Sequence, residues 1–281
     1  MGFVASVIAA VVVGTWNGNW FPSGRAEHRA HPDVEAATIS AAAKMLAKGL
    51  RAVDPEGTND VILCVNEVRG MEVATNLVAQ IGRKGLRVAS ISAYRRRDRF
   101  DQQQDMIATT LPVAEAHWSK WKVAKELTPP RGYAFAAVII DPATTANVYA
   151  VHLKSNYGAT TPELRASNRE KRTLAIAQLV SQEKRKRGRP ARPVLVAGDM
   201  NADCWRKEFA EEKLFGLFAD EGFENPLALL PPKSRGTHPS RSYGDSALDY
   251  IFCRGVSAVA APKIIPNDEL SDHYAVFVLV K

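Results

Sequence analysis

The sequence predicts a globular protein that contains both helices and strands. Three observations support this: short apolar runs that end in polar residues, segments with apolar residues at helical spacing, and a composition of 46% hydrophobic and 24% charged residues. With 281 residues, the chain is long enough to bury a large core in one domain or two smaller ones. We find no internal repeat and no break in composition, so we expect a single domain over residues 1–281.

Apolar runs that end at a turn or at a polar residue predict the strands. The run over residues 3–13 is too short to cross a bilayer and lacks the basic start of a signal peptide, so its second half is interpreted as a strand. Residues 133–140 and 147–153 form a hairpin pattern with a longer loop between them. The other expected strands are 7–15, 61–65, 86–93, 194–197, 246–252, 258–265 and 274–280.

Capping residues and helical spacing predict the helices. Asp33 follows Pro32 as a cap candidate for a helix over residues 33–53, and Thr161 caps a helix that continues to about Gly188. A further helix over residues 71–83 would end at Gly85, because glycine is favoured just after a helix. A short helix is expected over residues 205–213.

The charge of the chain indicates the class of its partner. A formal net charge of +7 favours polyanions, which are nucleic acid or an anionic membrane, although an ordinary basic protein has the same balance. Residues 94–100 place four arginines around two aromatic residues. This pattern suits a nucleic-acid backbone, and a solvated loop explains it equally well.

The cysteine content excludes two kinds of stabilisation. Three cysteines, Cys64, Cys204 and Cys253, are too few for a disulfide scaffold, and their spacing matches no metal site. Cys64 lies in an apolar run and is interpreted as a buried small hydrophobic residue. Cys204 and Cys253 can pair only in an oxidising compartment.

Polar residues recur where the predicted strands end. Asp199 and Asn201 follow the strand at residues 194–197 at a spacing of two, which directs both to the same side of an extended chain. A carboxylate only accepts hydrogen bonds, whereas a carboxamide donates and accepts, so the pair can hold a water and steady a phosphate oxygen. An Asx turn that closes a strand explains this stretch equally well. Further polar residues at strand ends are Asn17, Glu67, His152, Asp249, Asp272 and His273.

Each of these residues, taken alone, has a structural explanation such as a turn or a helix start. Asp249 differs, because it lies inside a predicted apolar strand, where an ionised carboxylate is costly unless it is paired. A histidine is its natural partner. A structural explanation for the whole set is harder to sustain, since each member falls where a sheet presents its edge to a cleft.

Six short motifs resemble, in order, those of the endonuclease/exonuclease/phosphatase superfamily, which includes pancreatic-type deoxyribonucleases, abasic-site endonucleases, sphingomyelinases and inositol-polyphosphate phosphatases. They are Thr15-Trp16-Asn17, Asn66-Glu67, Val151-His152, Gly198-Asp199-Met200-Asn201, Leu248-Asp249-Tyr250 and Ser271-Asp272-His273. The set is specific, although no single motif is. The resemblance implies an α+β fold: a four-layer αββα sandwich of two mostly antiparallel sheets, with helices outside and an active site between the sheets at one end.

The resemblance also implies a divalent cation. Glu67 and Asp272 would hold it, with Asn17 beside them. Mg²⁺ is the expected ion, with Mn²⁺ or Ca²⁺ able to substitute or assist, because hard cations prefer oxygen ligands. Such an ion would polarise the phosphate and stabilise the leaving oxygen.

The implied catalytic residues surround this cation. Asp199 and Asn201 would position the attacking water and the phosphate. Asp249 would orient His273, and that pair would supply the general base or polarise the phosphate. His152 would contact the phosphate and assist the leaving oxygen. Arg131, a looser match, would grip the phosphate.

The substrate class follows from differences between the branches of the superfamily. The stretch Gly198-Asp199-Met200-Asn201-Ala202-Asp203-Cys204 is most similar to that of pancreatic-type deoxyribonucleases and secreted bacterial nucleases. His152 stands where abasic-site endonucleases have tyrosine, and Cys253 does not stand where deoxyribonucleases place the partner of Cys204. We therefore expect a nuclease with little sequence preference that acts foremost on double-stranded DNA, with RNA as a further substrate.

We further expect a monomer, secreted rather than cytoplasmic, without stable membrane association. Two alternatives remain open. One is a phosphodiesterase for a lipid or small phosphoester, for which residues 114–123, with two tryptophans, are a weak candidate for a membrane-docking hairpin. The other is a catalytically inactive module that binds nucleic acid.

Overall fold

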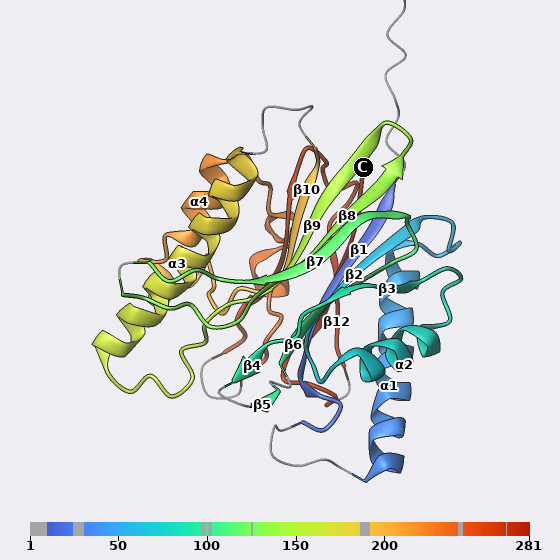
Figure 1. Ribbon diagram of the computed structural model, residues 1–281, viewed down its shortest axis with the longest axis horizontal. Helices are drawn as coiled ribbons and strands as arrows, with labels where there is room; N and C mark the ends of the chain where they lie inside the picture. Colours follow the sequence, from blue (N-terminus) through green and yellow to red (C-terminus); the bar gives the residue numbers. More distant parts are fainter. Residues whose placement is uncertain are drawn as a thin grey trace, which may run out of the picture.

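The protein forms two packed β-sheets with helices on both outer faces (Figure 1). Helices α1 (Pro32–Val53) and α2 (Met71–Ile81) cover one sheet, and α3 (Pro162–Arg185) and α4 (Leu214–Asp220) cover the other. The expected α+β sandwich of four layers is thereby confirmed. This computed structural model describes residues 10–24, 31–96, 99–100, 103–124, 126–185, 192–240, 244–267 and 269–281.

The first sheet has six strands in the order β12-β13-β1-β2-β6-β3. All neighbouring strands are antiparallel except β1 and β2, which are parallel. The strands are β1 (Val11–Phe21), β2 (Asp60–Val68), β3 (Arg87–Ile91), β6 (Gln104–Thr109), β12 (Lys263–Ile265) and β13 (Ala275–Val280).

The second sheet has five strands in the order β11-β10-β9-β8-β7, and again one neighbouring pair, β9 and β10, is parallel. Its strands are β7 (Val113–Lys120), β8 (Gly132–Asp141), β9 (Thr144–His152), β10 (Val194–Asp199) and β11 (Asp249–Arg254). Two short strands, β4 (Arg95–Arg96) and β5 (Arg99–Phe100), pair separately. Residues 97–98 of the arginine-rich stretch lie outside the described residues.

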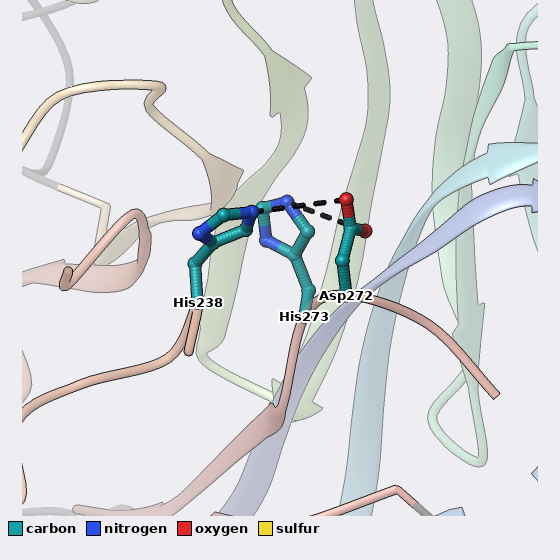
Figure 2. Close-up of side chains that lie close together, drawn as sticks. All are labelled: His238, Asp272 and His273. Atoms are coloured by element: carbon teal, nitrogen blue, oxygen red, sulfur yellow. Dashed lines mark ion pairs between the residues drawn. The ribbon is translucent and has the colours of Figure 1, made fainter. Parts of the chain in front are cut away.

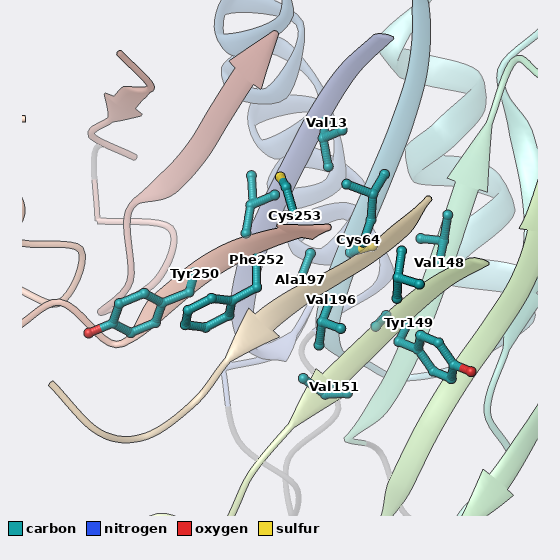
Figure 3. Close-up of a cluster of buried hydrophobic side chains, with 14 of the residues drawn as sticks. Val13, Cys64, Val148, Tyr149, Val151, Val196, Ala197, Tyr250, Phe252 and Cys253 are labelled. Carbon is teal, nitrogen blue, oxygen red and sulfur yellow. The ribbon is translucent and has the colours of Figure 1, made fainter. Parts of the chain in front are cut away.

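Alternation of side chains along the strands divides the core into layers. Val148 and Cys253 lie in the buried layer between the two sheets, as Cys64 does from the first sheet (Figure 3). Their neighbours in sequence point the other way: Phe252 stacks on Phe218 of α4, with ring centroids 4.1 Å apart. Aromatic side chains thus join the second sheet to its helices, and small or branched side chains join the sheets.

The first two strands extend beyond their predicted ends. β1 continues past Thr15 to Phe21, and β2 continues through Glu67 to Val68, whereas residues 1–9 lie outside the described part of the chain. The pairing of β1 with β2 is regular as far as Asn17 and Asn66 and then shifts in register. Asn17 and Glu67, which were predicted to follow these strands, therefore lie inside them, close to the point where the pairing becomes irregular.

Three loop and strand predictions are wrong in their bounds. The expected strand over residues 258–265 is reduced to Lys263–Ile265, next to Pro262, which cannot donate a ladder hydrogen bond. The hairpin loop is tight rather than long, because Asp141 pairs with Thr144. Asp249 begins β11 instead of lying inside a strand.

The predicted helix over residues 205–213 is also wrong. An Asx turn, in which Trp205 N donates to Asp203 Oδ1 at 2.8 Å, begins the segment, and only a 3₁₀ turn follows over Lys207–Phe209. The α-helix starts later, at Leu214. The buried ring of Tyr250, with which the Trp205 ring stacks, holds the segment in its non-helical path.

The remaining predicted helices have slightly different ends. α2 ends at Gly82, whose φ of 72° is left-handed, and not at Gly85. α3 is described to Arg185, and its predicted continuation to Gly188 lies outside the described residues. The three cysteines are free, so Cys204 and Cys253 do not pair. Among the described residues, no helix combines the length and apolar character needed to cross a membrane.

Candidate active site

The carboxyl ends of the two parallel strand pairs meet at one end of the sandwich. In the first sheet Asn17 of β1 lies beside Asn66 of β2, and in the second sheet His152 of β9 lies beside Asp199 of β10. Asp249 flanks Asp199 on its other side, because antiparallel β11 begins where β10 ends. The topology therefore gathers residues from five distant segments at one place.

Gly198 allows the two sheets to approach each other closely here. Its φ is +142°, and a Cβ atom at this position would lie 1.9 Å from Val151 O and 2.9 Å from Asn66 Oδ1. Only glycine avoids both contacts. As a result, the amide of Asp199 in the second sheet donates a hydrogen bond of 3.1 Å to Asn66 Oδ1 in the first.

The Asp199 carboxylate is held by amide groups. Its Oδ1 accepts a hydrogen bond from Asn201 N at 2.8 Å, and its Oδ2 accepts from Asn201 Nδ2 and Asn17 Nδ2, each at 2.9 Å. Burial, together with the charge of Asp249, raises the pKa of Asp199 to about 6 against the opposing effect of His273. The carboxylate is thereby fixed in position, and its affinity for a proton is increased.

Glu67 lies next to Asp199 across the gap between the sheets. Its Oε1 accepts from Asn17 Nδ2 at 3.3 Å, and its Oε2 accepts from Trp20 N at 3.0 Å and Gln103 Nε2 at 2.8 Å. The side chain is buried, and its backbone φ is 61°. Each hydrogen bond directs the positive end of an N–H dipole toward this carboxylate and holds it in position.

His152 bridges these two acids. Its Nε2 lies 3.6 Å from Glu67 Oε1 and 3.5 Å from Asp199 Oδ2. Burial first, and the charges of Arg131 and His273 in addition, lower the pKa of His152 well below its usual value. Its buried Nδ1 has no hydrogen-bond partner within the described chain. His152 is therefore a neutral imidazole at the boundary between the acids and the groove.

His273 has a much stronger anchor. Its Nδ1 lies 2.7 Å from Asp249 Oδ2, and the same oxygen accepts a hydrogen bond of 2.8 Å from Thr237 Oγ1. Burial lowers the pKa of His273, but the charges of Asp249 and Asp199 outweigh it and raise the pKa to about 10. Its Nε2 faces Asp199 Oδ2 and Asp272 Oδ1, each at 3.9 Å.

Asp272 lies at the edge of the site, with half of its side chain exposed. Burial raises the pKa of Asp272, and interactions with His238 and His273 lower it more, so the carboxylate is ionised. Its Oδ2 lies 3.7 Å from His238 Nε2 (Figure 2). The predicted metal ligands Glu67, Asp272 and Asn17 line one groove, but Asn17 turns its amide nitrogen toward the acids, and its Oδ1 accepts from Asn19 N at 3.0 Å.

Arg131 lies behind the site. Its Nε donates to His152 O at 3.2 Å, one terminal nitrogen donates to Leu153 O at 2.9 Å, and the other donates to Gln103 Oε1 at 2.9 Å. These bonds support the end of β9 and the loop that carries Gln103. Arg131 also lines the groove, and its contact with a phosphate stays a prediction.

The donors of this site fit a hard divalent cation. Glu67, Asp199 and Asp272 line the same groove, and Mg²⁺ and Mn²⁺ bind such carboxylate oxygens. The compact donor clusters among the described residues are one of His238, Asp272 and His273 and one of Asp199, Asp249 and His273, and neither includes Glu67. Asn17 and Gln103 place amide N–H groups against these carboxylates, where a cation would otherwise balance their charge. Of the predicted set, only Asp249 is absent from the groove lining, since it lies behind His273.

Sequence reasoning gave no role to several residues that support the site. Asp105 is buried below it, where its Oδ1 accepts from Asn66 Nδ2 at 2.7 Å and its Oδ2 accepts from Tyr94 OH at 3.1 Å. Burial raises the pKa of Asp105 to about 7. An acid inside an apolar strand was a usable signal, as it was for Asp249. Thr237 and His238 lie in a turn-rich stretch that gave no signal.

The groove around the acids is basic. Five cationic side chains line it outside the acidic floor: Arg95, Lys120, Lys154, Arg165 and Arg206. Glu208 also lines the groove and forms an ion pair with Arg206. Tyr157 lines it as well and is 94% exposed. An acidic floor with a cationic rim can hold a divalent ion and the anion that this ion attracts.

A family model described as the Endonuclease/Exonuclease/phosphatase family matches residues 14–273. The chain belongs to this family. The match spans every strand-end motif, from Thr15 to His273. Together with the fold, it identifies the chain as carrying the architecture of phosphoester hydrolases, and divalent metals are general in this family.

Solved structures agree with this assignment at the level of the fold. A family protein from Leptotrichia buccalis has 13% identity over 96% of this chain and 99% of its own, with a TM-score of 0.63. The human nocturnin catalytic domain with bound sulfate has 14% identity over 97% and 94%, with a TM-score of 0.64. Sphingomyelinase C from Streptomyces griseocarneus has 16% identity over 96% and 99%, with a TM-score of 0.59. No curated protein sequence matches this chain.

Proposed function

We propose that the protein is a divalent-metal-dependent nuclease that hydrolyses phosphodiester bonds, foremost in double-stranded DNA. The observation that carries this proposal is the basic rim around the acidic floor. The five cationic side chains of the rim come from β4, β7, α3 and two loops, so they can contact several phosphates at once. A small phosphoester has only one or two phosphates and would leave most of the rim unused, whereas a nucleic-acid backbone presents a charge at every nucleotide.

Two further observations favour nucleic acid over a lipid. Tyr157, exposed at the rim, offers an aromatic face on which a base can stack. The weak candidate for a membrane-docking hairpin divides its two tryptophans: Trp118 is partly exposed, but Trp121 is buried against Tyr133, with ring centroids 5.1 Å apart. The proposal therefore takes the protein to act without stable membrane attachment, and it keeps the monomer expected from the sequence.

The groups of the site have distinct roles in this reaction. A Mg²⁺ ion held by Glu67 and Asp272 would supply positive charge to the phosphate and to the leaving oxygen. The raised pKa of His273 supports the second of its two predicted roles, in which it donates from Nε2 to a phosphate oxygen. Asp199 then accepts the proton of the attacking water, which a raised pKa also favours. Asn201 and Asn17 hold this carboxylate in place.

His152 and Arg131 act on the other side of the phosphate. The neutral imidazole of His152 donates one hydrogen bond to the phosphate or the leaving oxygen without adding a charge. Arg131 holds His152 through its carbonyl oxygen and adds positive charge to the groove. This arrangement supports hydrolysis by in-line attack of water from the side of Asp199.

The test presents circular plasmid, linear DNA, RNA and sphingomyelin in parallel, each with Mg²⁺, with Mn²⁺ and with EDTA. We expect plasmid nicking with either metal and none with EDTA, and we expect Asp199→Ala to be inactive. Turnover of sphingomyelin with DNA untouched would support the lipid alternative and contradict the proposal. DNA that is bound but never cut would indicate an inactive binding module.

A further inference from the structure

His238 takes no part in the roles assigned so far, yet its position is well defined. It lies in the loop before β11, where its backbone N–H donates to Ser246 O at 2.9 Å and its carbonyl accepts from Ser246 N at 3.0 Å. Its ring meets the ring of His273 edge to face, with centroids 4.8 Å apart. The side chain is 29% exposed and lines the groove, so it is both fixed and accessible.

His238, Asp272 and His273 converge on one point. One ligand atom from each residue, a ring nitrogen or a carboxylate oxygen, lies within 4.8 Å of the other two. Both imidazoles direct a nitrogen toward Asp272, at 3.7 Å from His238 and 3.9 Å from His273 (Figure 2). Ligands about 2.1 Å from a tetrahedral ion are about 3.4 Å apart, so the two distances to Asp272 exceed this separation by no more than about 0.5 Å.

The chemistry of this set differs from that of the acidic floor. Two imidazoles and one carboxylate favour Zn²⁺ and similar transition-metal ions, whereas Mg²⁺ prefers oxygen ligands. The second ring nitrogen of His273 is held by Asp249, and a carboxylate on that nitrogen fixes the orientation of a metal-binding histidine. Three protein ligands with one open side are typical of an exchangeable zinc site rather than a closed structural one.

We propose that His238, Asp272 and His273 form a zinc site, and that zinc bound there inhibits the enzyme. The ion takes the Nε2 lone pairs of both histidines, and any proton on these atoms passes to water. His273 can then no longer donate to a phosphate, and Asp272 is withdrawn from the catalytic cation. The inhibition rests on the proposed function, whereas the binding of zinc does not.

Zinc binding is tested without substrate. Metal-free protein competes with a chromophoric zinc chelator, and the wild type is compared with His238→Asn and with His31→Asn. His31 is the matched control, because it also lies near an aspartate, with Nδ1 3.4 Å from Asp33 Oδ2, but is largely exposed and lies outside the groove.

We expect one zinc ion per wild-type chain, an affinity lower by about tenfold or more in His238→Asn, and no change in His31→Asn. Equal affinity in wild type and His238→Asn, or no competition by the wild type, would overturn the site. Co²⁺ provides a second measurement that does not depend on one substitution. Its visible absorption should show tetrahedral coordination in the wild type and in His31→Asn, and should be lost in both His238→Asn and His238→Phe.

Inhibition is tested by adding zinc to the Mg²⁺-dependent reaction, with each variant compared with its own zinc-free rate. The zinc concentration for half inhibition should rise about tenfold in His238→Asn, in step with its weaker binding. Equal inhibition of wild type and His238→Asn would overturn the regulatory role. If the zinc-free protein cuts no nucleic acid, the nuclease proposal fails, and the binding measurements still decide the zinc site.

Discussion

His273 and His152 lie in the same groove, but their surroundings are opposite. His273 is anchored through Nδ1 by Asp249, whose carboxylate is held in turn by Thr237. His152 has no partner for its Nδ1 among the described residues, and its Nε2 lies more than 3.4 Å from both neighbouring acids. The pKa of His273 is raised to about 10, and that of His152 is lowered well below its usual value.

This contrast shows that burial alone does not decide the charge of a histidine. Both rings are buried, and burial lowers both pKa values, but only His273 has a carboxylate within hydrogen-bond distance. One imidazole is therefore held as a cation and the other as a neutral group. We expect His273 to contribute more to catalysis than His152. Substitutions at and around each histidine test this expectation.

The largest effect is expected on the His273 side. His273→Ala and Asp199→Ala should each lower kcat for plasmid cleavage by about 10³- to 10⁴-fold, because the first removes the charged donor to the phosphate and the second removes the base that takes the proton of the attacking water. Circular dichroism should show that both variants fold, and His31→Asn should keep the wild-type rate. Wild-type cleavage by His273→Ala or Asp199→Ala would contradict the proposed roles.

The second-largest effect is expected at Asp249, which holds the ring of His273 in place. Asp249→Asn keeps the size of the side chain but removes its charge, so His273 loses the partner that fixes its tautomer and raises its pKa. We expect kcat to fall by about 10²- to 10³-fold. The pH–rate profile should move as well, since His273 then titrates at lower pH. A lower rate with an unchanged profile would indicate damage to the structure instead.

The third effect is on stability. The pKa of His273 in the folded protein, about 10, exceeds its usual value of 6.5, so folding favours the protonated ring. This stabilisation is complete below pH 6.5 and is lost as the pH rises through about 10. Between these pH values the metal-free wild type should lose up to about 5 kcal/mol more than His273→Gln in urea unfolding. The buried thiols and tyrosines are the same in both proteins, so their contributions to the pH dependence of stability cancel. Equal losses of stability in the two proteins would therefore refute a protonated His273.

The smallest effect is expected at His152. His152→Asn keeps one hydrogen-bond donor near the phosphate, and no anchored charge is lost. We expect kcat to fall by only about tenfold. If plasmid cleavage by this variant falls as far as that by His273→Ala, the two histidines contribute equally, and the contrast between them has no catalytic meaning.

Much of the fold and of the site could be predicted because the signals are local. Apolar runs that end in polar residues located β2, β9, β10 and β13 to within a few residues. The cost of an acid among apolar neighbours led correctly to a histidine partner for Asp249, and His273 is that partner. Six ordered motifs then implied which strand ends would meet.

The errors arise where distant contacts override local preference. Residues 205–213 have helical spacing, but the Asx turn at Asp203 and the stacking of Trp205 on Tyr250 exclude a helix there. Asp105 carried the same signal as Asp249, but it lies in a stretch whose strands were not recognised. The position of His238 beside Asp272 depends on the path of a loop, which no local pattern describes.

The hydrogen bond between the amide of Asp199 and Asn66 Oδ1 links the two halves of the sandwich at their point of closest approach. Because neither half holds both partners, neither can assemble the reaction centre by itself. The geometry of the site therefore requires both sheets to be folded and docked. A partly folded chain with one intact sheet would lack part of the site.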